Sequence, residues 1–123
     1  GTLTPEHVLR LKPFPMIVST DINDALRRFC RDYQLYFTEH SNGTMVKLND
    51  CPKWCVIENV GVFSISFQVS ELTIIEAIAR ENMAAIGKAE TFSEWRPLAK
   101  SDLFDIEYWV LEQRKLTKRA KIA

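Results

Sequence analysis

The chain has 123 residues, of which 46% are hydrophobic and 26% charged, and this size and composition fit one compact domain. Sixteen basic and sixteen acidic residues cancel, which excludes the strong positive field that draws nucleic acid or an anionic membrane. No apolar run approaches the roughly 20 residues of a membrane span and no apolar signal core is present, so we expect a cytoplasmic protein without nucleic-acid or membrane partners.

Residues 1–18 are predicted to be an extended lead-in, because two X-Pro steps favour an extended path. The same segment carries the candidate substrate-binding residues His7, Arg10 and Lys12. Arginine and lysine are the side chains that hold phosphate or carboxylate groups. The alternative interpretation is a solvated charged segment, as chain termini often are. If the three residues bind substrate, we expect them to serve the site of a neighbouring domain.

A long amphipathic helix is predicted next, ending near residues 40–43. Asp21 offers a capping oxygen at its start. Asn42-Gly43 can adopt the left-handed conformation that stops a helix. One face of this helix is apolar, because hydrophobic residues recur at three- and four-residue steps: Ile22, Ala25, Leu26, Phe29, Tyr33, Tyr36 and Phe37.

The middle of the chain predicts β-structure. A short edge strand is expected at Met45–Leu48, followed by a hairpin whose strands are Trp54–Glu58 and Val62–Phe67. The turn between these strands is Asn59-Val60-Gly61, in which the glycine can take a positive φ.

Two further helices are predicted, at residues 70–88 and 101–118. The last one begins with carboxylates and ends with lysines and arginines, which matches the helix dipole. Its acidic residues are therefore interpreted as a solvated face and not as paired catalytic carboxylates: Asp102, Asp105, Glu107 and Glu112.

The last helix also carries an apolar stripe. Phe104, Tyr108 and Leu111 are spaced to face the core, with Lys115 at the edge. We therefore place a single α/β domain at residues 19–118 and a tail or linker at residues 119–123.

The cysteines are interpreted as packing residues. Cys51 and Cys55 lie close together and His40 lies upstream, but a structural zinc site needs four ligands and only three are nearby. Free cysteines are also among the residues most often buried. We therefore assign no metal site and no catalytic residue.

Three segments carry a family resemblance. The run Cys55-Val56-Ile57-Glu58-Asn59-Val60-Gly61-Val62-Phe63 resembles the Asn-His-Gly-Leu-Phe segment of class II aldolase/adducin-type domains. The run from Leu103 to Leu116 resembles the part that precedes the dehydrogenase in bifunctional class II aldolase/short-chain dehydrogenase proteins, which are similar to rhamnulose-phosphate aldolase in their first part. Thr4 to Lys12 is similar to the join that follows their zinc-bearing region.

The chain departs from this family in ways that bear on function. Val60 stands where the resemblance implies a zinc-binding histidine, and no His-x-His occurs in the chain. The sequence also lacks the Gly-x-x-x-Gly-x-Gly loop and the Tyr-x-x-x-Lys pair of a short-chain dehydrogenase. The resemblance therefore implies a middle domain of a larger oxidoreductase-type polypeptide. It does not imply that this domain carries out either reaction.

We expect an α/β fold in which a small, mostly antiparallel sheet of three or four strands is covered by long helices. The preferred function is a non-catalytic scaffold or interaction domain whose partners are flanking catalytic domains of the same polypeptide or further copies of itself. We expect no cofactor in this domain, with NAD or NADP bound by a flanking dehydrogenase. The alternative is an enzyme fragment that contributes sugar-phosphate or hydroxy-acid binding residues to a site completed by another domain or subunit.

Overall fold

The computed structural model describes residues 1–120, and their side chains as far as Leu116. It confirms the α/β fold class: the described residues form five helices and a three-stranded sheet. The helices are α1 (Pro5–Leu11), α2 (Ile22–His40), α3 (Val69–Glu90), α4 (Lys100–Glu107) and α5 (Val110–Ala120). The strands are β1 (Met16–Val18), β2 (Trp54–Ile57) and β3 (Gly61–Ser64).

The sheet is mixed, with the order β1-β2-β3. β2 and β3 form the expected antiparallel hairpin, in which Ile57 pairs with Gly61. Asn59 and Gly61 both take positive φ, 62° and 153°, to close the turn. β1 then adds to β2 in parallel, with Met16 opposite Cys55. The expected mostly antiparallel sheet is therefore one antiparallel pair and one parallel pair.

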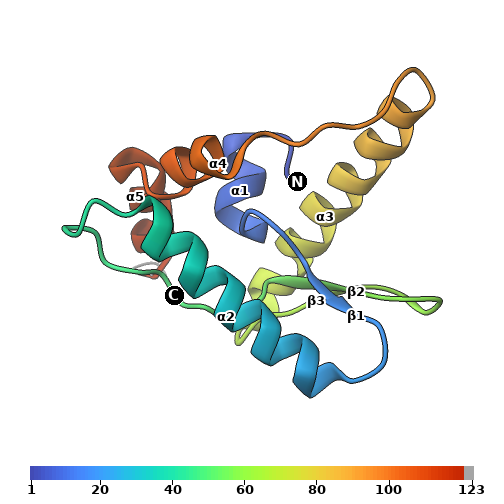
Figure 1. The fold of residues 1–123 in the computed structure, drawn as a ribbon, viewed down its shortest axis with the longest axis horizontal. Coiled ribbons are helices and arrows are strands. Elements are labelled where there is room, and N and C mark those ends of the chain that lie inside the picture. The colour runs from blue at the N-terminus through green and yellow to red at the C-terminus, as the bar shows by residue number, and fades with distance from the viewer. Residues whose placement is uncertain (121–123) are drawn as a thin grey trace.

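A helix packs on each face of this sheet, α2 on one side and α3 on the other (Figure 1). Cys55 belongs to a buried cluster with Phe29 of α2, whereas its neighbour Trp54 belongs to a second cluster with Ile75 of α3. Successive side chains of a strand point to opposite faces. The sheet is therefore the middle layer of three.

The predicted extended lead-in at residues 1–18 is wrong as local structure, because it contains α1 and β1. Thr4 caps α1, its Oγ1 accepting from the His7 backbone N–H at 3.3 Å, and Pro5 opens the first turn. The N-terminal residues are also tied to α3. Asn82, which is fully buried, accepts from the Leu3 backbone N–H at 3.1 Å. The two X-Pro steps, at Pro13 and Pro15, favour an extended chain only after this helix ends.

The predicted helix at residues 101–118 is also wrong as a continuous element, because it breaks between α4 and α5. Tyr108 stands at the break, with φ −95° and ψ 10°. Its ring stacks on Phe104 at 4.5 Å, and its hydroxyl accepts from the Leu48 backbone N–H at 3.1 Å. The segment Met45–Leu48, expected as an edge strand, is a loop. Its Leu48 backbone N–H donates to this tyrosine and not to a neighbouring strand.

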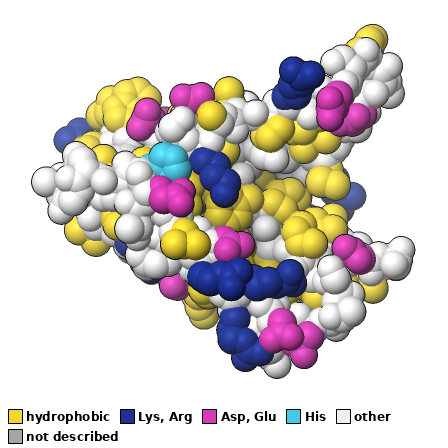
Figure 2. Space-filling model, in the orientation of Figure 1, with side chains coloured by type: hydrophobic (Ala, Val, Ile, Leu, Met, Phe, Trp, Pro, Cys, Tyr) yellow, Lys and Arg dark blue, Asp and Glu magenta, His cyan; other side chains and the backbone are white. Residues whose placement is uncertain are grey.

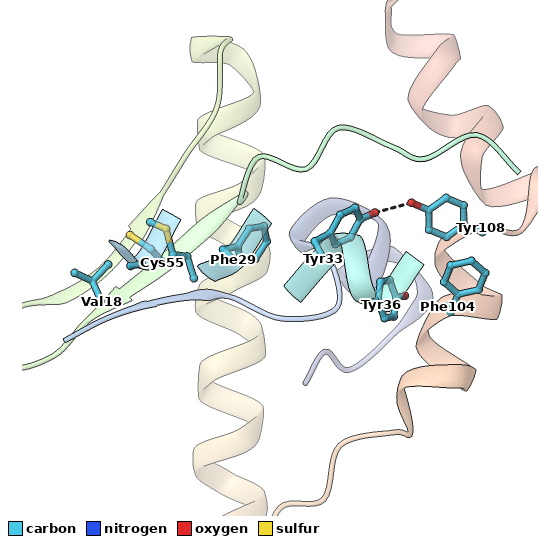
Figure 3. Packing of buried hydrophobic residues seen from close by; sticks show 9 residues of the cluster. Val18, Phe29, Tyr33, Tyr36, Cys55, Phe104 and Tyr108 are labelled. Carbon is cyan, nitrogen blue, oxygen red and sulfur yellow. Dashed lines mark hydrogen bonds between the residues drawn. The ribbon is translucent and has the colours of Figure 1, made fainter. Parts of the chain in front are cut away.

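A run of aromatic rings joins the sheet to α4 (Figure 3). Phe29, Tyr33 and Tyr36 project from α2, as the helical periodicity predicts, and contact one another. Tyr36 meets Phe104 edge-on, with ring centroids 5.4 Å apart. Aromatic pairs in such geometries add stability beyond the area that they bury. This cluster is the larger part of the core.

Truncation of Tyr108 and truncation of Leu111, both near the α4–α5 break, should have different effects on stability. Tyr108 is buried, whereas Leu111 is 52% exposed, so the expected apolar stripe does not extend to Leu111. We expect Tyr108→Ala to lower the free energy of unfolding by about 3–5 kcal/mol. Leu111→Ala should change it by less than about 0.5 kcal/mol. Denaturant unfolding of both variants checks this, and equal losses would contradict the placement of the break.

Candidate functional site

A small cleft lies where the end of α1 meets the loop before β2, the start of α3 and the end of α4. Its volume is about 110 Å³. Charged side chains from four separate segments converge on it: Arg10, Lys12, Lys53, Glu71 and Glu107. Leu9, Leu48 and Leu116 supply apolar walls.

Lys12 is the most unusual residue of the cleft. Its side chain is buried, with 4% of the residue exposed, and its backbone takes a left-handed φ of 64° at the end of α1. The ammonium donates to the Asn49 carbonyl and lies 3.9 Å from the centre of the Tyr33 ring. Burial lowers the pKa of Lys12 to about 8; the charge of Lys53 adds to this, and Glu107 and Asp50 oppose it.

Glu107 is the buried acid of the cleft, with 1% of the residue exposed. Its carboxylate accepts from the Tyr33 hydroxyl and, at 3.0 Å, from the Tyr36 hydroxyl. The Tyr33 hydroxyl also lies 2.8 Å from that of Tyr108 (Figure 3). Burial raises the pKa of Glu107, while the tyrosine hydrogen bonds and the charge of Lys12 act in the opposite direction. Burial likewise raises the pKa of all three tyrosines. The network ties α2 to α4.

The other two cations of the cleft are each held by a carboxylate. Arg10 donates to Glu6 at 2.9 Å along α1. Lys53 lies 3.5 Å from Glu71 at the start of α3. Pairing of this kind fixes the side chains in place more than it stabilises the fold.

The structure separates His7 from the other two candidate binding residues. Arg10 and Lys12 both line the cleft, whereas His7 faces α3, with its Nε2 3.7 Å from Glu81. Its Nδ1 lies 2.5 Å from the Thr4 hydroxyl, and its buried Nε2 has no hydrogen-bond partner. All three residues are buried on α1 or at its end.

Sequence reasoning missed Glu107 and Lys53. Glu107 was assigned to a solvated face, and this is wrong because it is buried, as is Glu112. The signal was the i+3 and i+4 spacing from Phe104 and Leu103, which puts Glu107 on the buried face of α4. Lys53 lies in the loop just before β2, and sequence reasoning assigned it no binding role.

The hairpin tip and the cysteines lie outside this cleft. Val60 is 69% exposed at the turn between β2 and β3. Cys55 is buried, as expected for a packing residue, and burial raises the pKa of its thiol. Cys51 and Cys30 are half-buried, and all three thiols are free. In the part of the chain that the structure describes, no three His, Cys, Asp or Glu side chains group as metal ligands. Nor is any described helix long and apolar enough to cross a membrane.

Comparison with known proteins identifies one family. A family model described as "Aldolase class II, second domain" matches residues 1–116. The chain is similar to a Bacillus subtilis (strain 168) protein named "Uncharacterized oxidoreductase YuxG", with 22% identity over 129 residues. This alignment covers 95% of the chain but only 19% of that relative. No solved structure matches.

The buried amine of Lys12 should make stability depend on pH. Its pKa is about 8 in the folded chain and 10.5 when exposed. As pH rises through 8, the folded state loses this proton before the unfolded state does, so stability should increase. We expect the free energy of unfolding to rise by about 1 kcal/mol per pH unit relative to Lys12→Met, up to about pH 9.5.

Lys47→Met is the matched control, since this half-buried lysine lies outside the cleft. It should keep the rise that Lys12→Met loses. Chemical denaturation at several pH values measures the free energy of unfolding of the parent chain and both variants. If the pH dependence of the parent chain and of Lys12→Met were the same, the Lys12 amine would not be buried.

Proposed function

Because this chain belongs to the family of class II aldolase second domains, we propose that it is a non-catalytic scaffold or interaction domain of a larger aldolase/short-chain dehydrogenase-type oxidoreductase. Its relative in Bacillus subtilis carries the word oxidoreductase in its name and is several times longer than the aligned region. The activity would belong to the flanking regions, with NAD or NADP bound there. The cytoplasmic location expected from the sequence is part of this proposal.

The loss of a metal ligand at Val60 supports a non-catalytic role. In the family resemblance, this position carries the zinc-binding histidine, and valine has no lone pair to offer a metal. Val60 stands at an exposed hairpin turn. We propose that the aldolase reaction, if the polypeptide performs it, uses residues outside this domain.

The observation that carries the interaction role is an apolar groove between β3 and α3. It has a volume of about 260 Å³; Val62, Ala79 and Met83 form its apolar part, and Ser64, Glu76 and Arg80 also line it. Figure 2 shows hydrophobic side chains gathered in the recess between the far end of α3 and the hairpin. β3 is an edge strand with one unpaired side. An apolar groove beside an open edge is typical of a surface that another element covers.

The occupant that we propose for this groove is another region of the same polypeptide. The Bacillus relative extends far beyond the aligned region, so a protein of that kind has ample chain to cover the groove. Exposed hydrophobic side chains continue beyond the groove at Phe67, in the segment that joins β3 to α3, and at Val69, the first residue of α3. A homo-oligomer is the other partner that fits the same surface.

The second candidate function is the contribution of binding residues to a substrate site completed by another domain or subunit. It is favoured by one observation: Arg10 and Lys12, chosen from sequence, meet in the same cleft. Sugar phosphates and hydroxy acids both carry the anionic group that such residues bind.

The isolated chain should contain no stoichiometric metal and should show no activity of its own. Elemental analysis of protein purified without chelator should find far less than one zinc per chain. Assays with sugar phosphates and with both nicotinamide cofactors should give background rates. One tightly held zinc per chain would overturn the scaffold proposal. Turnover that survives repurification and disappears in Lys12→Met would favour the second candidate instead.

Charged substitutions in the groove should weaken association without unfolding the domain. Val62 and Met83 are both 43% exposed, so Val62→Glu and Met83→Glu should leave the free energy of unfolding nearly unchanged. Each should weaken binding to the separately expressed remainder of the polypeptide by about tenfold or more.

Leu35→Glu is the control, since this exposed leucine lies on α2 away from the groove. Sedimentation of the mixed chains measures the association. If Met83→Glu bound the remainder of the polypeptide as tightly as the parent chain does, the groove would be excluded as the contact surface. Self-association of the domain that Met83→Glu abolishes would assign the groove to a homo-oligomer.

A further inference from the structure

We propose that the cleft at the end of α1 binds one small anion, a phosphate group or a short carboxylate, between the ammonium groups of Lys12 and Lys53. This inference rests on the second candidate function. It names the class of ligand and assigns Lys53, which was not a candidate site residue from sequence, as a binding residue. It also requires that the isolated chain binds the anion without help from another domain.

Among the described side chains, Lys12 has no carboxylate within ion-pair distance, because Glu107 acts on it only from farther away. Arg10 and Lys53 each have a carboxylate partner, Glu6 at 2.9 Å and Glu71 at 3.5 Å. Lys12 takes part in none of the ion pairs formed within 4 Å among the described residues. A buried ammonium without an adjacent counter-ion is costly. An anion in the cleft would supply that counter-ion.

The hydrogen bonds of Lys12 leave room for such a ligand. An ammonium carries three N–H donors. One donates to the Asn49 carbonyl, and the Tyr33 ring covers another side of the group. A donor therefore remains on a side chain that lines the cleft.

The two lysines also repel each other across this space. Both lysines line the cleft, and the charge of Lys53 contributes to the lowered pKa of Lys12. Leucine side chains line part of the wall and keep the local dielectric low, so both the repulsion and its relief by an anion are stronger than in water. Binding of an anion should therefore raise the pKa of Lys12.

The size of the cleft limits the ligand. Its volume of about 110 Å³ leaves room for several water molecules. A phosphate group or a two- or three-carbon carboxylate fits this space. A whole nucleotide does not fit, although the phosphate of a larger molecule could enter if the rest of that molecule lay outside.

Titration of the isolated chain with inorganic phosphate, with lactate and with chloride tests this inference, by NMR of the labelled lysine side chains and by calorimetry. We expect saturable one-to-one binding of phosphate or lactate and none of chloride. Which of the two binds distinguishes a phosphate ligand from a carboxylate ligand. Affinity should fall between about pH 7 and pH 9 as Lys12 loses its proton.

Two variants and a matched control complete the test. Lys12→Met and Lys53→Met should each weaken binding at least tenfold. Lys47→Met should not, although Lys47 and Lys53 have equal side-chain exposure, 28%, and similar ion-pair distances, 3.4 and 3.5 Å. If Lys12→Met fails to fold, Lys53→Met still tests the proposal.

The inference would be overturned if neither anion bound at concentrations on the order of 10 mM. Binding that neither Lys12→Met nor Lys53→Met weakened would overturn it as well. Loss of anion binding would leave the groove between β3 and α3 untouched, so the scaffold proposal stands or falls separately through the association measurement.

Discussion

The buried carboxylate of Glu107 is the interaction on which the arrangement of the helices depends. It accepts hydrogen bonds from two tyrosines of α2 while standing at the end of α4. A buried acid of this kind is tolerated only when its oxygens accept hydrogen bonds. This requirement fixes the position of α4 relative to α2. Lys12 beneath the Tyr33 ring brings the end of α1 into the same network. The network therefore fixes Lys12 and Glu107, which both line the cleft.

Much of this architecture follows from local patterns. The spacing of Phe29, Tyr33 and Tyr36 predicts both α2 and the face that it buries, and Asp21 caps it as expected. The apolar runs on either side of Asn59-Val60-Gly61 predict the hairpin. These elements are determined by periodicity of side chains and by turn residues, which act over a few positions. The resemblance to class II aldolase domains needed longer runs but no knowledge of tertiary contacts.

The parts that sequence reasoning missed depend on contacts between distant segments. α1 is short, and it gains its stability from packing against α3 and α4 more than from propensity. The break after α4 has no proline or glycine to mark it, and only the partners of the Tyr108 side chain explain it. The same applies to the cleft: Arg10 and Lys12 are close in sequence, but Lys53 reaches them only through the fold.

The parallel pairing of β1 with β2 has a consequence for how the domain assembles. The connection between these strands contains the whole of α2, so the two strands and the helix form a β-α-β crossover. The hairpin can form early from neighbouring residues, but on its own a two-stranded hairpin is marginal in water. β1 must pair with β2 across a long connection. Closing this loop costs conformational entropy before the contacts of β1 can form. We therefore expect the N-terminal strand to be the last part of the sheet to join, and a polypeptide that lacks it would retain only the β2–β3 hairpin of the sheet.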